Sequence, residues 1–142
     1  MSGVSLLRDL TTRVNTELGH LGCATLFNDD HCVLLMPHFP GPIWVVELID
    51  GEDGFGLRGG IGLGLGLVAD DTGDATILYE QVRGVVVDGT MVEYVEHSSS
   101  GLRSVAYEYS HPSGGGSSGS KPSRGAIAIA YPAWTSPDSD EE

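Results

Sequence analysis

Two glycine-rich segments contain the residue types that bind phosphate groups in other proteins. Residues 54–59 read Gly-Phe-Gly-Leu-Arg-Gly and match the GxGxxG pattern of dinucleotide-binding loops. That loop needs a helix directly after it to hold the pyrophosphate, but residues 60–67 alternate glycine with isoleucine or leucine and have no helical period. In residues 114–121 the lysine stands one place late for a P-loop, and Pro122 replaces the serine or threonine that would hold magnesium. We therefore expect no nucleotide site in either segment.

Residues 59–68 alternate glycine with large apolar residues, which predicts a strand with one bare face. A strand of this kind costs backbone entropy, so another group should use the space that the glycines leave. We expect Leu63 and Leu65 to point into the core, and Gly62 and Gly64 to lie beneath a close-packed neighbour. The alternative is that the bare face forms the wall of a groove that admits a ligand or a partner segment.

Cysteine and histidine residues could supply a nucleophile, a metal ligand or a disulfide. A turn at residues 28–31 would pair Phe27 with Cys32 and Cys23 with Met36, so the two sulfur atoms would lie too far apart for a disulfide. Two free thiols are typical of a reducing compartment. The five histidines are scattered, and no standard metal-ligand spacing or nucleophile motif includes them. We therefore expect no catalytic residue, no metal and no cofactor.

The charge balance limits the classes of partner. The chain has 20 Asp and Glu residues against 7 Lys and Arg residues, for a net charge of -13. Nucleic acid and an anionic membrane would be repelled, so we expect neither as a direct partner. Glu93 and Glu96 would lie on opposite faces of a strand and would not form a catalytic carboxylate pair. The first residues lack the pattern of a signal peptide, which predicts a cytoplasmic protein.

Acidic residues gather in the expected turns. In an antiparallel meander, alternate turns lie at the same end of the sheet, so the acids of two turns would meet there. These five residues are Asp29, Asp30, Asp50, Glu52 and Asp53. Aspartate is a common turn former and aids solubility, which is one interpretation of the cluster. The other is a negative surface that steers a basic protein partner.

Hydrophobic periodicity predicts the elements that position these residues. Residues 4–21 carry apolar side chains at steps of three and four, which predicts one amphipathic helix whose buried face is Leu7, Leu10, Val14, Leu18 and Leu21. Beyond it, short β-branched runs separated by turn residues predict up to nine antiparallel strands. The strands span residues 23–27, 32–36, 43–49, 55–68, 75–82, 85–87, 90–97, 102–109 and 126–131. Asp88 and Gly89 would form a tight hairpin turn.

The predicted fold class is α+β, with an N-terminal helix packed on a twisted, mostly antiparallel sheet of about seven to nine strands. A smaller sheet of four to five strands is the alternative. Residues 1–134 would form a single domain, with residues 112–124 as a flexible Gly/Ser-rich loop within it and residues 126–131 returning to the same sheet. Residues 135–142 would form an acidic, disordered tail.

Two classes of function remain open. The leading one is a non-catalytic acidic binding protein of the immunity or antitoxin type, which would block a basic toxin or nuclease-like enzyme by presenting acids where substrate phosphates bind. The alternative is a small-ligand-binding or enzymatic domain with a pocket walled by residues 59–68, in which Trp44, Tyr79 or Tyr94 offers a stacking surface. The oligomeric state does not follow from the sequence.

Overall fold

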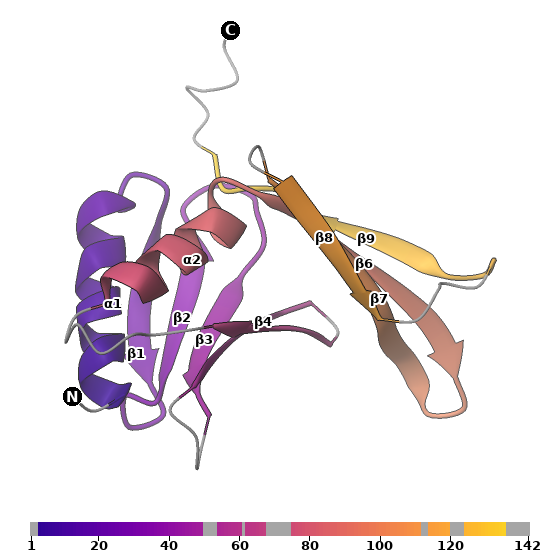
Figure 1. Cartoon of the computed structure of the whole chain (residues 1–142), viewed down its shortest axis with the longest axis horizontal. Coiled ribbons are helices and arrows are strands. Elements are labelled where there is room, and N and C mark those ends of the chain that lie inside the picture. Colours follow the sequence, from indigo (N-terminus) through magenta and orange to yellow (C-terminus); the bar gives the residue numbers. More distant parts are fainter. Residues whose placement is uncertain are drawn as a thin grey trace, which may run out of the picture.

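The structure is a computed structural model that describes residues 3–49, 54–60, 62–67, 75–111, 114–119 and 124–135. Within these residues, two helices and two antiparallel sheets form an α+β fold (Figure 1). The predicted fold class is confirmed. The strands do not form one large sheet, however, because they divide between a five-stranded and a four-stranded sheet.

Helix α1 spans Gly3–Glu17 and packs beside strand β1 (Figure 1). The predicted apolar face is confirmed, because Leu7, Leu10 and Val14 are buried within the helix. Leu18 and Leu21 are buried too, although the helix ends before them. The helix is therefore shorter than the predicted span of residues 4–21, while its buried face continues into the segment that enters the first strand.

The first sheet is a meander in which each strand pairs with the next along the chain, in the order β1-β2-β3-β4-β5. Its strands span Gly22–Phe27, Cys32–Pro37, Trp44–Leu48, Phe55–Gly59 and Leu63–Leu67. In the first hairpin Phe27 pairs with Cys32 and Cys23 pairs with Met36, as predicted. Both cysteines are free, which confirms the prediction from the hairpin register.

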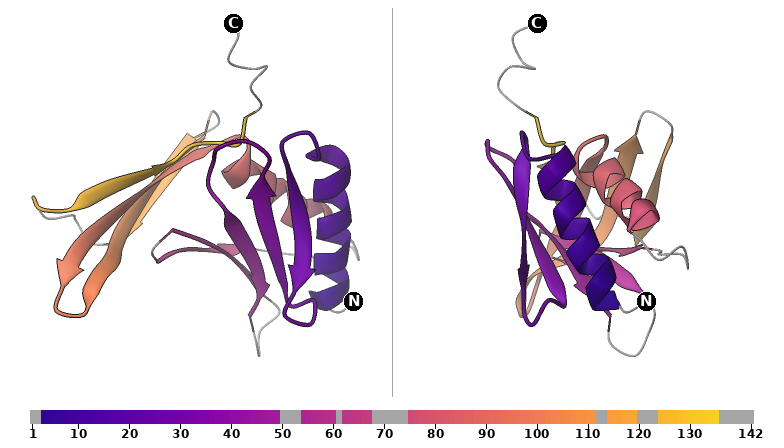
Figure 2. Two further views of the ribbon diagram at one scale, coloured as in Figure 1. Left: turned by 180° about the vertical axis from the view of Figure 1, so that it is seen from behind. Right: turned by 90° about the vertical axis from the view of Figure 1, so that its left-hand side faces the viewer.

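The two faces of the first sheet have different environments. Both helices lie on the same side of the strands β1 to β3 (Figure 2). The face beneath the helices, which we call the inner face, carries the buried core of the sheet. Its buried members are Ala24, Val33, Leu35, Trp44, Val46, Phe55, Leu57, Leu63 and Leu67. The opposite side, which we call the outer face, is turned away from both helices.

The two strands that we predicted at residues 75–82 and 85–87 are absent, and a helix occupies this segment. Helix α2 spans Thr76–Val86, and its buried side chains are Leu78, Tyr79, Val82 and Val86. Their spacing of one, three and four residues places them on one helical face. The β-branched residues of this segment favour a strand, but β propensity depends on context, and burial of the helical face in the core outweighs it here.

The end of α2 explains why the predicted hairpin turn at Asp88 and Gly89 is absent. The N–H groups of Val87 and Asp88 both donate to the carbonyl oxygen of Arg83, at 2.9 and 3.0 Å, which ends the helix. A side chain at Gly89 would place its Cβ 2.6 Å from Cε1 of Tyr109. Gly89 therefore serves a close approach between the helix end and the next sheet.

The strand predicted at residues 55–68 is two strands, β4 and β5, joined by a tight turn. Gly60 has a φ of +62°, which L side chains rarely adopt, and a Cβ there would also meet the Tyr131 hydroxyl and the Glu93 carboxylate. The hairpin pairs Arg58 with Gly64, so the alternation of side chains continues in step on both strands. The turn therefore leaves no break in the sequence pattern.

The second sheet has the order β8-β7-β6-β9 and projects away from the first (Figure 1). Its strands β6 to β9 span Thr90–Ser98, Gly101–His111, Gly114–Gly119 and Ile127–Tyr131. Strand β8 lies within the segment predicted as a loop, where its backbone pairs with that of β7. The returning strand is present as β9 and joins β6. Residues 136–142 of the predicted tail lie outside the described residues.

Trp134 joins the end of the described chain to the first sheet. Its indole N–H donates to the carbonyl oxygen of Pro42 at 2.8 Å, and its backbone N–H donates to Val86 at 2.8 Å. The buried ring covers Gly22, where a Cβ would lie 2.9 Å from Cε3 of the indole. This anchor was not predicted from the sequence.

Candidate binding face

Large apolar side chains are exposed on the outer face of the first sheet. The exposed fraction is 44% for Phe27, 41% for Met36, 50% for Ile43 and 39% for Ile49. Phe27 and Met36 lie on β1 and β2, and Ile43 and Ile49 flank β3. Because side chains alternate along a strand, these residues face away from their neighbours Leu26, Leu35, Trp44 and Leu48, which lie in the core or pack against it. Isolated exposed apolar residues are normal, but several on one sheet face indicate a binding surface.

A groove of about 830 Å³ lies over this outer face. All five strands contribute to it: the side chains come mainly from β1 to β3, and the β4–β5 hairpin contributes chiefly glycines. The groove is lined by Phe27, Cys32, Ile43, Val45, Glu47, Arg58, Gly59, Gly60, Gly62, Leu63 and Gly64. The groove wall that we gave as the alternative role of the alternating segment is therefore present.

The bare side of β5 is open and not packed, which corrects our prediction for Gly64. A Cβ added at Gly64 or at Gly66 would meet no heavy atom within 4 Å. At Gly62 the prediction is right, because a Cβ there would lie 3.0 Å from Cβ of Ser104. Leu63 is buried and Leu65 packs against the core, as predicted. The leucines of β5 thus pack on the inner face of the sheet, while Gly64 and Gly66 leave open space on its outer face.

One ion pair lies within the apolar surface of the groove. Nη1 of Arg58 donates to Oε2 of Glu47 at 3.1 Å across the β3–β4 pair. The Arg58 side chain is largely exposed, and exposed pairs of this kind stabilise a fold by less than about 1 kcal/mol. The two side chains are therefore available to exchange this contact for one with a bound partner.

The structure places the predicted acidic residues only in part. Asp29 and Asp30 lie in the β1–β2 turn, where both have positive φ angles. Asp30 accepts from Arg8 of α1 at 3.0 Å, so its charge is partly balanced, whereas Asp29 is exposed. Asp50, Glu52 and Asp53 lie outside the described residues.

The residues that flank positions 50–53 lie at the same end of the sheet as the β1–β2 turn. The N–H of Leu48, at the end of β3, donates to the carbonyl oxygen of His31 at 2.9 Å, and the N–H of Ile49 donates to Gly54 at 3.1 Å. The order of the first four strands is the meander on which the prediction depended. The ends of β3 and β4 therefore lie beside the β1–β2 turn, and the placement of Asp50, Glu52 and Asp53 stays a prediction.

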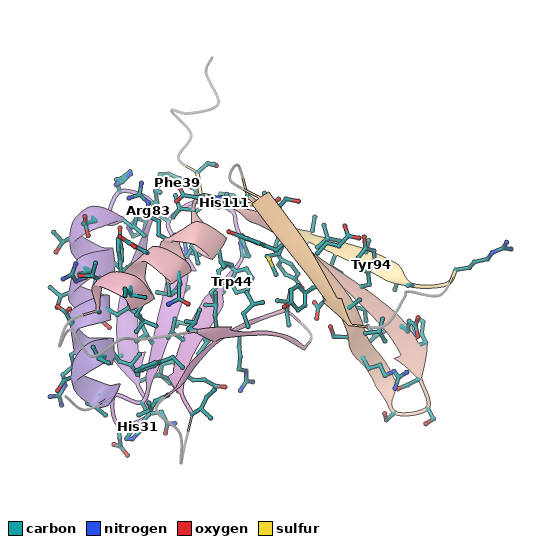
Figure 3. All side chains as sticks on the ribbon, viewed as in Figure 1. His31, Phe39, Trp44, Arg83, Tyr94 and His111 are labelled. Atoms are coloured by element: carbon teal, nitrogen blue, oxygen red, sulfur yellow. The ribbon has the colours of Figure 1, made fainter. Side chains whose placement is uncertain are left out.

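The aromatic residues that we considered as stacking surfaces do not line the groove. Trp44 and Tyr79 are buried in the core, and Trp44 packs against Tyr131 with ring centroids 5.9 Å apart. Tyr94 lies on the second sheet (Figure 3). Figure 3 also shows His31 at the lower left of the molecule and His111 at its top, well apart, so these two rings do not share a site.

A buried carboxylate, which we considered from the sequence only as half of a catalytic pair, lies between the two sheets. Glu93 of β6 is fully buried; it accepts a hydrogen bond from the Tyr131 hydroxyl at 2.6 Å and one from the N–H of Gly62 at 2.8 Å. Burial, together with the hydrogen bond and charge of Glu93, raises the pKa of Tyr131 well above its usual value. The sequence signal was that Glu93 lies two residues from both Met91 and Val95, so the three side chains share one face of the strand. Met91 and Val95 are both buried.

Glu93 is enclosed by protein, so it positions the β4–β5 turn beside the second sheet and does not face the groove.

Within the described part of the chain, no three His, Cys, Asp or Glu side chains come close enough to hold a metal ion. Neither described helix has the length and apolar character of a membrane-spanning segment. No protein-family model, curated protein or solved structure matches this chain.

Proposed function

We propose that this protein is a non-catalytic acidic binding protein that holds a basic partner protein against the outer face of its five-stranded sheet. In the form first considered from the sequence, it is an immunity or antitoxin type inhibitor and the partner is a toxin or nuclease-like enzyme. The observation that supports this proposal is the exposed apolar outer face with its groove, on the side of the sheet that neither helix covers.

The surface has the composition of a protein interface. Exposed aromatic and aliphatic side chains such as Phe27 and Ile43 supply apolar area, and a single ion pair between Glu47 and Arg58 supplies polar contacts. Water is excluded from such side chains only when a partner covers them, and this burial stabilises a complex. A flat or shallow face of this kind suits a protein partner better than an enclosed pocket would.

The sign of the partner's charge follows from electrostatics. The net charge of -13 attracts cationic proteins and repels anionic ones over distances of about 10 Å at ordinary salt. Asp29 is exposed in the turn next to Phe27, so part of this charge lies at the rim of the outer face. Rim charges raise the association rate and select the partner, while the apolar centre supplies most of the affinity.

Affinity capture with three versions of the protein tests the proposal. The parent, an outer-face variant (Phe27→Ser with Ile43→Ser) and a control (Leu102→Ser with Ile127→Ser) serve as bait in an extract of the native cells. Leu102 and Ile127 are exposed to a similar degree but belong to the second sheet. We expect a basic protein that the parent and the control retain and the outer-face variant loses. A retained protein that is acidic, or that the outer-face variant still binds, contradicts the proposal.

The groove also favours a second candidate, a binding site for a small molecule. Its volume of about 830 Å³ falls within the range of about 300 to 1,000 Å³ that ligand pockets occupy. Thermal-shift screening of a metabolite set separates the two candidates. A small molecule that raises the melting temperature of the parent but not that of a Gly64→Leu variant favours the second candidate.

A further inference from the structure

Strand β5 is an edge of the first sheet. It pairs with β4 on one side, and among the described residues no strand pairs with it on the other. An edge strand directs alternate backbone N–H and C=O groups away from its only neighbour. These groups are the standard acceptor site for an added strand from another chain.

The opposite edge of the same sheet, β1, is covered. The side chain of Asn15 in α1 bonds both backbone groups of Ala24: its Oδ1 accepts from the Ala24 N–H at 2.8 Å, and its Nδ2 donates to the Ala24 carbonyl at 3.0 Å. The asparagine amide thus occupies the place that a neighbouring strand would take. Asn15 thus protects one edge of the sheet, and in the described ranges we find no equivalent side-chain contact on the β5 edge.

Strand β5 also lacks the features that normally prevent strand addition. Its sequence, Leu-Gly-Leu-Gly-Leu, has no proline and no charge, and its register with β4 runs without a bulge. On the outer face Gly64 and Gly66 present no side chain and face open space. Glycine in a strand marks a site where another backbone approaches closely. Because Leu63 and Leu67 are buried, the strand is held in place, while Gly64 and Gly66 between them are exposed.

We propose that the partner adds an extended segment of about five residues to β5, as a sixth strand of the sheet. Alternate side chains of that segment would face the groove beside Gly64. This inference rests on the proposed function, because the charge argument selects the occupant. A second copy of the chain would bring a second net charge of -13 to the edge, whereas a segment that carries lysine or arginine is attracted.

The test uses a display library of random twelve-residue peptides selected on the purified protein. We expect the enriched peptides to share alternating apolar residues and a positive net charge. In the complex with a synthetic copy of one such peptide, hydrogen exchange should slow at backbone amides of residues 63–67. N-methylation of alternate peptide residues should abolish binding in one register and spare it in the other, which is the signature of a strand pairing.

Matched glycine variants locate the site. Gly64→Thr with Gly66→Thr should lower the peptide affinity at least tenfold, because the new side chains would occupy the space in which alternate side chains of the peptide lie. The melting temperature should not fall, because both positions have room and threonine favours strands. The control Gly116→Thr lies in β8, an edge of the second sheet with similar open space, and should leave the affinity unchanged. Loss of affinity in the control alone overturns the proposal.

Other outcomes separate this proposal from the proposed function. Basic peptides that bind the outer face with no protection at residues 63–67 overturn strand addition and leave the function standing. Protection of β5 by neutral or acidic peptides overturns the basic partner and leaves strand addition standing. A library without any enriched peptide, or a dimer that protects β5 in the absence of peptide, overturns the proposed occupant.

Discussion

The Tyr131 hydroxyl donates a hydrogen bond of 2.6 Å to Oε1 of Glu93, and this carboxylate has no exposure to solvent. The other oxygen of Glu93 accepts from the N–H of Gly62 in the β4–β5 turn. One carboxylate therefore connects β9, β6 and the hairpin of the first sheet. Because that hairpin contains the glycines of the groove, the position of the candidate binding face depends on a buried contact behind it.

Glu93→Gln should destabilise the protein by about 1 to 3 kcal/mol, because a neutral amide replaces the charged acceptor of the two buried hydrogen bonds from Tyr131 and Gly62. Urea denaturation measures the change in the free energy of unfolding. Glu80→Gln is the control, because Glu80 is exposed on α2 and its substitution should change stability by less than about 0.5 kcal/mol. Equal stability of the parent and Glu93→Gln would show that the carboxylate contributes nothing.

The raised pKa of Tyr131 predicts a loss of stability in alkali. The unfolded chain loses this proton near pH 10 and the folded protein only at higher pH, so the contribution is complete below about pH 10 and falls above it. The slope should be up to about 1.4 kcal/mol per pH unit. Tyr131→Phe should reduce the slope of denaturation midpoints between pH 9 and 11, with a remainder from Tyr79 and Tyr109, whose pKa values burial also raises.

Gly60→Ala and Gly64→Ala should have opposite effects. At Gly60 the positive φ and the contacts with Tyr131 and Glu93 oppose any side chain, so we expect a loss of at least about 1 to 2 kcal/mol. At Gly64 there is open space and ordinary backbone geometry, so alanine should be neutral or stabilise by up to about 1 kcal/mol. Thermal unfolding of both variants checks the contrast, and a tolerated Gly60→Ala would place the turn differently.

Leu63→Ala should cost about 2 to 5 kcal/mol, because it leaves a cavity at a buried position of the inner face. Leu102→Ala removes the same atoms from an exposed position of β7 and should cost far less. Denaturation curves of the two variants give the comparison directly. Similar losses in both would mean that the leucines of β5 do not face the core.

Removing the turn charges should change partner association more than stability. Asp29→Asn with Asp30→Asn keeps residues that tolerate positive φ and removes only one exposed ion pair, worth less than about 1 kcal/mol. The association rate with a basic partner should fall several-fold at low salt and converge with the parent at high salt. Stopped-flow measurements across ionic strength check this, and an unchanged rate at low salt would exclude steering by this turn.

The first hairpin and the helix before it could be predicted because local signals agree there. Turn residues at 28–31 set the register of Phe27 and Cys32, and the apolar steps of α1 match a helical face. Helix α2 could not be predicted in the same way, because its β-branched composition favours a strand and only contacts with distant parts of the core select the helix. The pairing of β8 comes from its backbone, and glycine-rich sequences carry little signal of it.

The candidate face was predicted only through its glycines and its turn acids. Strand β2 reads Cys-Val-Leu-Leu-Met-Pro, a continuous apolar run that is typical of strands covered on both sides. Nothing local indicates that the helices cover only one side and leave Met36 exposed. The structural role of Glu93 was missed because its hydrogen-bond donors are distant in sequence. Its period-two position marks it as inward-facing, but the donors come from residues about 30 to 40 places away in the chain.

The contacts of Trp134 affect how the chain folds during its synthesis. Its indole N–H bonds Pro42 across 92 positions of sequence, and its ring fills the space over Gly22. Contacts of such separation form late, because the intervening chain must first be ordered. On the ribosome, the first hairpin emerges long before the residue that seals it. In the nascent chain, the surface that the Trp134 ring covers at Gly22 therefore stays open until residue 134 has been synthesised. A chaperone would protect this surface during that period.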